Sequence, residues 1–240
     1  GEITFESKDF KKSLTYFSNL EDASIDQEDL SISNTGQFYC FHYLENYNAT
    51  IKYAKKVLNI SNLKNKLQED AYLYLGQSFQ EINKLDSAKQ YYDSVIKFTN
   101  SIAAAEAKYH ICEIAYQDND YTLCESLIME LVQQKPSYDY WLAKGILLLG
   151  DNFIAQKDYF NAKHSIESIL ENYQGIKKDE ILANAIQKME YIKSLELNEF
   201  KTEPVQQEIE IDLDSFVNKD ENKINVEDDD LIENNKDENK

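Results

Sequence analysis

The stretch that decides the fold is AEAKYHICEIAYQDNDYTLCESLIMELVQQKP, residues Ala105–Pro136. Its apolar residues gather in two runs, Ile111–Ala115 and Tyr121–Leu131, with the three- and four-residue spacing of one helix face. The polar residues Gln117–Asp120 separate the two runs, and a proline closes the second. This pattern predicts two short amphipathic helices joined by a turn and folded back on each other.

The same pattern recurs along most of the chain. Five small residues, spaced 36 to 38 positions apart, mark the expected tight contact between paired helices: Ser13, Thr50, Ala88, Cys124 and Ala162. A bulky apolar residue stands three positions before each of them, and apolar residues follow four and seven positions after. An apolar residue of the preceding helix stands nine positions before, or eight in the case of Phe5. In that order the columns are Phe10, Tyr47, Leu85, Tyr121 and Tyr159; Phe17, Ala54, Tyr92, Ile128 and Ile166; Leu20, Val57, Val95, Leu131 and Ile169; and Phe5, Phe41, Phe79, Ala115 and Phe153. Because one helix pair cannot bury its apolar face alone, the columns predict a stack of pairs.

This pattern resembles the tetratricopeptide repeat family over roughly residues 1–173. The residues that carry the resemblance are Leu75, Gly76, Phe79, Ala88, Tyr92 and Val95, then Ile111, Cys112, Cys124, Ile128, Leu131 and Pro136, then Leu149, Gly150, Phe153, Ala162, Ile166 and Ile169. The resemblance implies an all-α fold, an α-solenoid of antiparallel helix pairs wound into a superhelix. The period here averages about 37 residues against about 34 in the family, so we expect slightly longer helices or connections.

A narrower resemblance concerns Ser137–Tyr173. This segment is similar to the terminal repeat of large multi-repeat proteins of the Bacteroidota, many of which are envelope proteins. The resemblance implies the C-terminal part of such a protein and suggests the periplasm or cell envelope, with the cytoplasm left open.

Composition divides the chain into three parts. We expect a repeat array over residues 1–175, with a truncated first repeat and about four further helix pairs, and a capping helix over residues 176–197. Residues 198–240 contain 15 acidic residues and 5 lysines. A segment so charged cannot bury enough apolar surface to offset its ordering entropy, which predicts a disordered acidic tail. Val205–Phe216 alternates apolar and acidic residues within it, as either a solvating segment or a short docking motif.

The overall charge excludes one class of partner. The formal net charge is −19, and all 25 basic residues are lysine. Phosphate binding requires clustered positive charge and favours the arginine fork, so nucleic acid is not an expected partner. No apolar run approaches 18 residues, so no membrane-spanning segment is expected in the sequence given.

Candidate chemistry is sparse. The sequence has no nucleophile elbow, no glycine-rich phosphate loop and no His–Glu zinc motif, so we expect no catalytic residue, no cofactor and no enzymatic activity. His42, His110 and His164 fall in three different repeats without partners at metal-ligand spacing, which argues against a metal site.

The three cysteines leave one question open. Cys112 and Cys124 occupy the two columns where paired helices approach most closely. They either serve as small apolar residues, like Gly76 with Ala88, or oxidise to a disulfide in an envelope-located protein.

The remaining candidate site is the concave surface that the resemblance implies, lined by the first helix of each pair. The residues expected to bind a partner there are Tyr74, Gln77, Tyr109, Glu113, Tyr116 and Asp151. Tyrosines and carboxylates suit an extended peptide with basic and apolar character, although the same tyrosines can instead pack between repeats.

The first hypothesis is therefore a non-enzymatic scaffold that binds a protein or peptide, as a monomer or within a larger complex. The alternatives are an accessory or capping segment of a larger envelope assembly or secretion protein, docked through the acidic tail, and the accessory module of an enzyme whose catalytic domain precedes Gly1.

Overall fold

The computed structural model describes the backbone of residues 1–202 and the side chains of residues 1–198. This part of the chain consists of eleven helices and contains no strand. The helices are α1 (Glu2–Glu6), α2 (Phe10–Ala23), α3 (Gln27–Tyr43), α4 (Tyr47–Leu58), α5 (Asn65–Glu81), α6 (Leu85–Phe98), α7 (Ile102–Gln117), α8 (Tyr121–Gln133), α9 (Asp139–Ala155), α10 (Tyr159–Asn172) and α11 (Lys178–Thr202).

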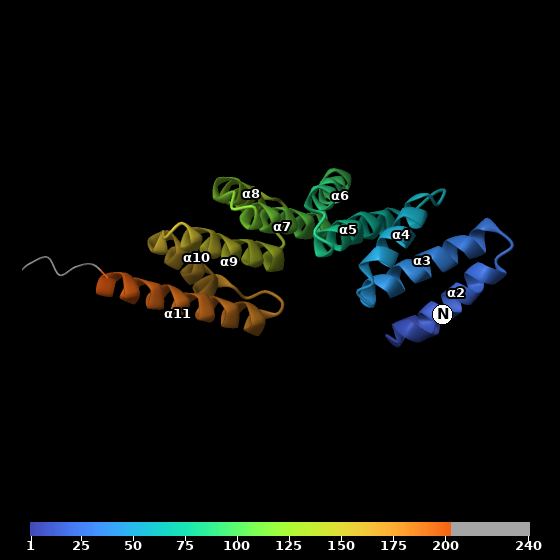
Figure 1. The fold of residues 1–240 in the computed structure, drawn as a ribbon, viewed down its shortest axis with the longest axis horizontal. Coiled ribbons are helices and arrows are strands. Elements are labelled where there is room, and N and C mark those ends of the chain that lie inside the picture. Colours follow the sequence, from blue (N-terminus) through green and yellow to red (C-terminus); the bar gives the residue numbers. More distant parts are fainter. Residues whose placement is uncertain (203–240) are drawn as a thin grey trace, which may run out of the picture. The chain divides into compact units, whose positions relative to one another are not determined.

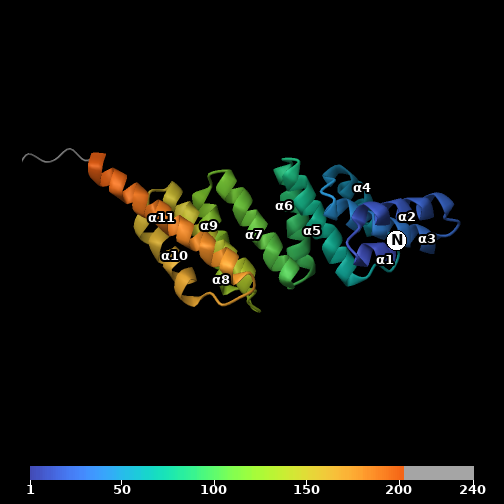
Figure 2. The same cartoon turned by 90° about the horizontal axis from the view of Figure 1, so that it is seen from below.

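The helices pack in chain order as antiparallel pairs (Figures 1 and 2). Each even-numbered helix from α2 to α10 lies against the odd-numbered helix before it and, up to α8, the one after it. The first helices of successive pairs also contact each other: α5 contacts α7, and α7 contacts α9. This is the expected α-solenoid of helix pairs, so the fold class predicted from the columns is confirmed.

The columns correspond to layers of the core. All five small residues, Ser13, Thr50, Ala88, Cys124 and Ala162, are 0% exposed. The residues four positions later are buried as well, and those seven later are buried except Leu20, which is half-buried. Each even-numbered helix from α2 to α10 begins at the bulky residue three before the small one. A spacing of four or seven residues returns to the same side of a helix, so one stripe of each helix is buried.

One turn geometry joins the helices of every pair. Its last residue before the N-cap has a positive φ of 55° to 62°, at Lys8, Glu45, Asn83, Asn119 and Lys157. The next backbone N–H donates to a carbonyl five residues back, at 2.8 to 3.0 Å in all five turns. At four of these turns the N-cap side chain, Asp or Asn, accepts from the third backbone N–H of the following helix. In each polar turn, the residue that ends the first helix is therefore followed directly by the N-cap of the second helix.

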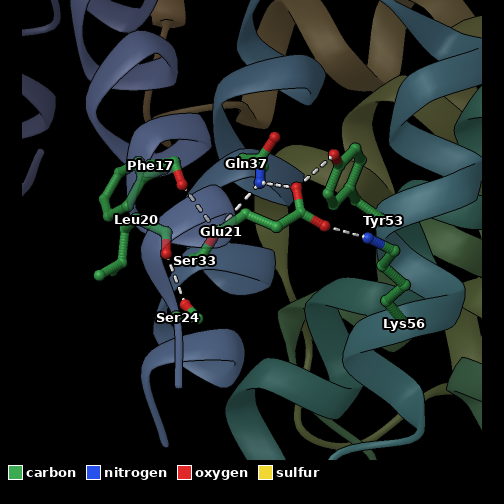
Figure 3. A network of polar contacts seen from close by, with 8 residues as sticks. All are labelled: Phe17, Leu20, Glu21, Ser24, Ser33, Gln37, Tyr53 and Lys56. Carbon is green, nitrogen blue, oxygen red and sulfur yellow. Dashed lines mark hydrogen bonds and ion pairs between the residues drawn. The ribbon is translucent and has the colours of Figure 1, made fainter. Parts of the chain in front are cut away.

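A charged side chain ties three consecutive helices together near the N-terminus (Figure 3). Glu21 of α2 accepts from Gln37 Nε2 of α3 at 2.6 Å and from the Tyr53 hydroxyl of α4 at 2.9 Å, and it pairs with Lys56 of α4. Burial alone would raise the pKa of Glu21, but these hydrogen bonds and the lysine charge lower it to about 2. The carboxylate therefore fixes α4 against α2 across α3.

The last helix follows the fifth pair and packs on it. Its buried residues Ile181, Ala185, Met189 and Ile192 join the core of α9 and α10. It runs to Thr202, past the residue 197 at which the sequence places its end, because nothing before Pro204 interrupts a helix. The predicted acidic tail beyond Thr202, with its Val205–Phe216 segment, lies outside the described residues.

The three cysteines are buried free thiols. Cys112 and Cys124 are both 0% exposed. Burial raises the pKa of Cys112, as does the nearby Cys124, and burial raises the pKa of Cys124 to about 11. Both side chains therefore fill the small-residue positions of their helices as apolar groups do.

Candidate binding surface

The odd-numbered helices carry all six residues that the sequence proposes for partner binding. Tyr74 and Gln77 lie on α5, Tyr109, Glu113 and Tyr116 on α7, and Asp151 on α9. The structure places four of them in one hollow, Gln77 in a second, and Tyr74 in neither.

The first place is a hollow of about 400 Å³ between α7, α9 and α11, called here the α7–α11 hollow. Four of the six proposed residues line it, namely Tyr109, Glu113, Tyr116 and Asp151. The other lining residues are Gln117, Lys144, Leu147, Leu148, Glu180, Ile181, Asn184 and Lys188. The lining thus combines apolar side chains with hydroxyl, amide, carboxylate and ammonium groups.

The wall formed by α11 is the part that the sequence reasoning missed. Lys188 of α11 donates to both carboxylate oxygens of Asp151 on α9, at 2.5 and 2.7 Å. Both side chains are partly exposed, at 21% and 29%. The pair therefore stands at the surface of the hollow, where an incoming charged group competes for either partner. The spacing within α11 indicated its buried stripe but not that its polar residues face α7.

Tyr109 packs inside the array and presents little of its side chain at the surface. Its side chain is buried, its ring lies 5.4 Å from that of Trp141 on α9, and Lys144 stands 4.5 Å above its face. Its hydroxyl donates to Glu113 Oε1 at 2.6 Å. The alternative that tyrosines pack between neighbouring repeats thus describes this residue, while Tyr116 remains partly exposed at the rim.

A charged cluster lies beneath the hollow. His110 Nδ1 is 2.7 Å from Glu113 Oε2, and Gln77 of α5 donates to Glu106 Oε1 at 2.8 Å. Burial alone would raise the pKa of Glu113, but His110, Tyr109 and Lys144 lower it. For His110 the effects are opposite. Burial alone would lower its pKa, but the carboxylates of Glu106 and Glu113 raise it. Both effects favour an imidazolium–carboxylate pair.

The second place is a hollow of about 340 Å³ between α3, α5 and α7, called here the α3–α7 hollow. It is lined by His42, Tyr43, Glu45, Tyr47, Gln77, Ser78, Glu81 and His110. Gln77 is therefore placed as a lining residue. Tyr74 is not in the lining, because its ring stacks on His42, with centroids 3.5 Å apart and planes 3° from parallel.

The described residues form neither a metal-binding cluster nor a membrane-spanning helix. No group of three or more His, Cys, Asp or Glu side chains is placed to hold a metal ion there. Of the helices in the same part of the chain, none combines the length and apolar character that crossing a membrane requires.

One segment of the chain matches a family model. Residues 70–98, which span most of α5 and all of α6, match the tetratricopeptide repeat family model. These residues form a tetratricopeptide repeat. Such repeats belong to a family of non-catalytic protein-interaction scaffolds. Like α5 and α6, the helices of the other four pairs pack against each other in chain order.

Solved structures show the same fold. The C-terminal part of a tetratricopeptide repeat-containing protein from Cytophaga hutchinsonii matches with a TM-score of 0.60 at 15% identity, over 81% of this chain and 78% of that chain. BtubC (BKLC) from P. vanneervenii matches with a TM-score of 0.54 at 14% identity, over 82% of this chain and 92% of that one. No curated protein matches the sequence. The first of these structures comes from the Bacteroidota, the group to which the narrower sequence resemblance pointed.

Proposed function

We propose that this tetratricopeptide array is a non-enzymatic scaffold that binds an extended peptide segment of a partner protein along its odd-numbered helices. The observation that carries the proposal is the α7–α11 hollow. It combines apolar side chains with charged and hydroxyl groups from three helices, and four of the six residues selected from the sequence line it.

The charges in the hollow define the kind of peptide. Glu113, Asp151 and Glu180 face Lys144 and Lys188, so acidic groups exceed lysines by one. Because Lys188 is paired with Asp151, a basic peptide residue replaces an existing ion pair rather than filling an empty site. We therefore expect selection for peptides that alternate basic and apolar residues, at moderate affinity, because exchange of one surface ion pair for another changes the free energy little.

A display library of random peptides tests the proposal. Selected peptides are then measured by fluorescence anisotropy against the whole chain, the Tyr116→Ala variant and the Asp151→Asn variant. We expect Tyr116→Ala to weaken binding about three- to thirty-fold, as the loss of one aromatic contact does. Asp151→Asn should weaken it less, about two- to five-fold, because a partly exposed ion pair contributes little free energy. His164→Gln, at an exposed histidine of α10, is the matched control.

Two results contradict the proposal. One is a library that yields no binder, and the other is a set of binders with unchanged affinity for both variants.

Removal of residues 203–240 separates docking through the acidic tail, the alternative hypothesis, from docking on the helices. Binding that disappears with that segment assigns docking to the acidic tail, and binding that survives assigns it to the helices.

A further inference from the structure

The α3–α7 hollow contains unsatisfied hydrogen-bonding groups that the proposed function does not use. Five buried polar side-chain atoms in the described residues have no hydrogen-bond partner, and two of them belong to residues that line this hollow. They are Ser78 Oγ of α5 and His110 Nε2 of α7. Ser78 is only 1% exposed. An unpaired polar atom in such a position destabilises the fold until a partner reaches it.

Both atoms present a hydrogen. Glu113 stays ionised and accepts from His110 Nδ1, so Nδ1 carries a proton. The two carboxylates around His110 favour the imidazolium form, in which Nε2 also carries a proton. Glu106 Oε1 lies 3.9 Å from His110 Nε2, beyond hydrogen-bond distance, and already accepts from Gln77. Ser78 contributes a hydroxyl, so the two free groups both suit an acceptor oxygen.

The rim restricts which oxygen can enter. The residues that line the hollow include the exposed carboxylates Glu45 and Glu81 and no lysine. A carboxylate ligand would be repelled by this rim, whereas the carbonyl of an amide carries no net charge. The N–H of an amide, or a nearby ammonium group, is attracted by the same rim.

We propose that the α3–α7 hollow binds a main-chain amide of a basic extended peptide, its carbonyl oxygen accepting from Ser78 Oγ and His110 Nε2 and a lysine-type side chain beside Glu45 and Glu81. The inference rests on the proposed function, since it names a second point of contact for the same peptide. The hydrogen bond that His110 Nδ1 donates to Glu113 links the lining of one hollow to that of the other through α7.

Small probes test the site without a known partner. We suggest NMR titration of the whole chain with N-acetyl-lysine-N-methylamide, N-acetyl-alanine-N-methylamide, acetate and methylammonium, following the His110 imidazole and the Ser78 amide signals. Saturable shifts are expected with both blocked amino acids, and the lysine probe should bind more tightly. Ser78→Ala should weaken both about three- to ten-fold, the equivalent of one hydrogen bond.

Controls separate the contacts. Glu45→Gln combined with Glu81→Gln should weaken the lysine probe and leave the alanine probe unchanged. Ser94→Ala removes a helical serine of α6 whose hydroxyl already donates to the Gln90 carbonyl, and should change neither. Circular dichroism confirms that each variant is folded.

Three results overturn the inference: unchanged affinity in Ser78→Ala, methylammonium or acetate binding as tightly as the blocked amino acids, or no saturable shift with any probe, in which case water satisfies the two groups. None of these bears on the proposed function. Library peptides that depend on Tyr116 and Asp151 but not on Ser78 would support that function while refuting this second site.

Discussion

Gly76 offers the sharpest test of the packing described here. It lies on α5 where this helix meets α6, and a Cβ at this position would stand 2.5 Å from Cδ1 and Cε1 of Tyr92. Tyr92 is fully buried, its hydroxyl donates to Gln80 at 2.7 Å, and its ring stacks 5.2 Å from that of His110. The ring is therefore held on several sides and cannot turn aside for an added methyl group.

The expected cost of Gly76→Ala follows from three terms. Overpacking of a filled core costs about 1–3 kcal/mol. Displacement of Tyr92 also weakens its hydrogen bond to Gln80, at about 1 kcal/mol. Alanine in a helix interior returns about 1 kcal/mol relative to glycine. The net destabilisation is about 2 kcal/mol, which lowers the melting temperature of a chain of this size by about 4–8 °C.

Gly145→Ala is the matched control. Its Cβ would lie 3.0 Å from Leu131 Cδ2, the far end of a flexible side chain, with the next atom at 3.8 Å. We expect its stability to stay within about 0.5 kcal/mol of the parent chain, because a small shift of one methyl group is offset by helix propensity.

The assay is urea denaturation followed by circular dichroism, with hydrogen exchange to locate the change, since repeat arrays can unfold locally. Faster exchange should be confined to α5, α6 and their neighbours in the Gly76 variant. Equal stability of the two variants, or a gain of stability at position 76, would refute the proposed contact between Gly76 and Tyr92.

Three further predictions concern other parts of the array. Glu21→Gln should lower the free energy of unfolding by about 1–2 kcal/mol at pH 7. The pKa of Glu21 in the folded chain, about 2, lies below its ordinary value of 4.5, so its stabilisation is present above pH 4.5 and is lost as the pH falls toward 2. If the stability of the parent chain and of the variant fell in parallel during acid titration, this prediction would be wrong. Asp120→Ala removes the hydrogen bond to the Leu123 N–H and should destabilise by about 1 kcal/mol in thermal melts, and an unchanged melt would argue against this cap. Cys112 and Cys124 should resist a thiol reagent in the native chain, and three thiols should react on unfolding without reductant; two unreactive thiols would establish the disulfide instead.

The helix pairs were predictable because their signals are local. The five small residues and the columns around them indicate which side of each helix is buried, and all five are fully buried in the structure. The structure adds a second local signal that the columns did not use: Asp9, Asn46, Asp120 and Asp158 each cap the second helix of a pair. The spacing of apolar residues and the N-caps both depend on residues close together in the chain, so they can be recognised without the tertiary structure.

The surroundings of the candidate residues were predictable only in part. Four residues selected from the first helices do line one hollow, but Tyr74 stacks on His42, a residue 32 positions earlier, and Tyr109 is buried against Trp141. Periodicity shows that a tyrosine lies on the side away from its own partner helix. Whether the next repeat covers it depends on how the pairs stack.

The sequence by itself therefore determined the all-α class, the helix pairs and the buried columns, because a helix can bury only the stripe that its own spacing creates. Tertiary structure alone decided that α11 forms the third wall of the α7–α11 hollow and that Lys188 reaches Asp151. It also decided that the atoms Ser78 Oγ and His110 Nε2, in residues that line the α3–α7 hollow, have no hydrogen-bond partner. These arrangements depend on the angle and offset between successive pairs, which arise from the fit of side chains on separate helices and leave no periodic trace in the chain.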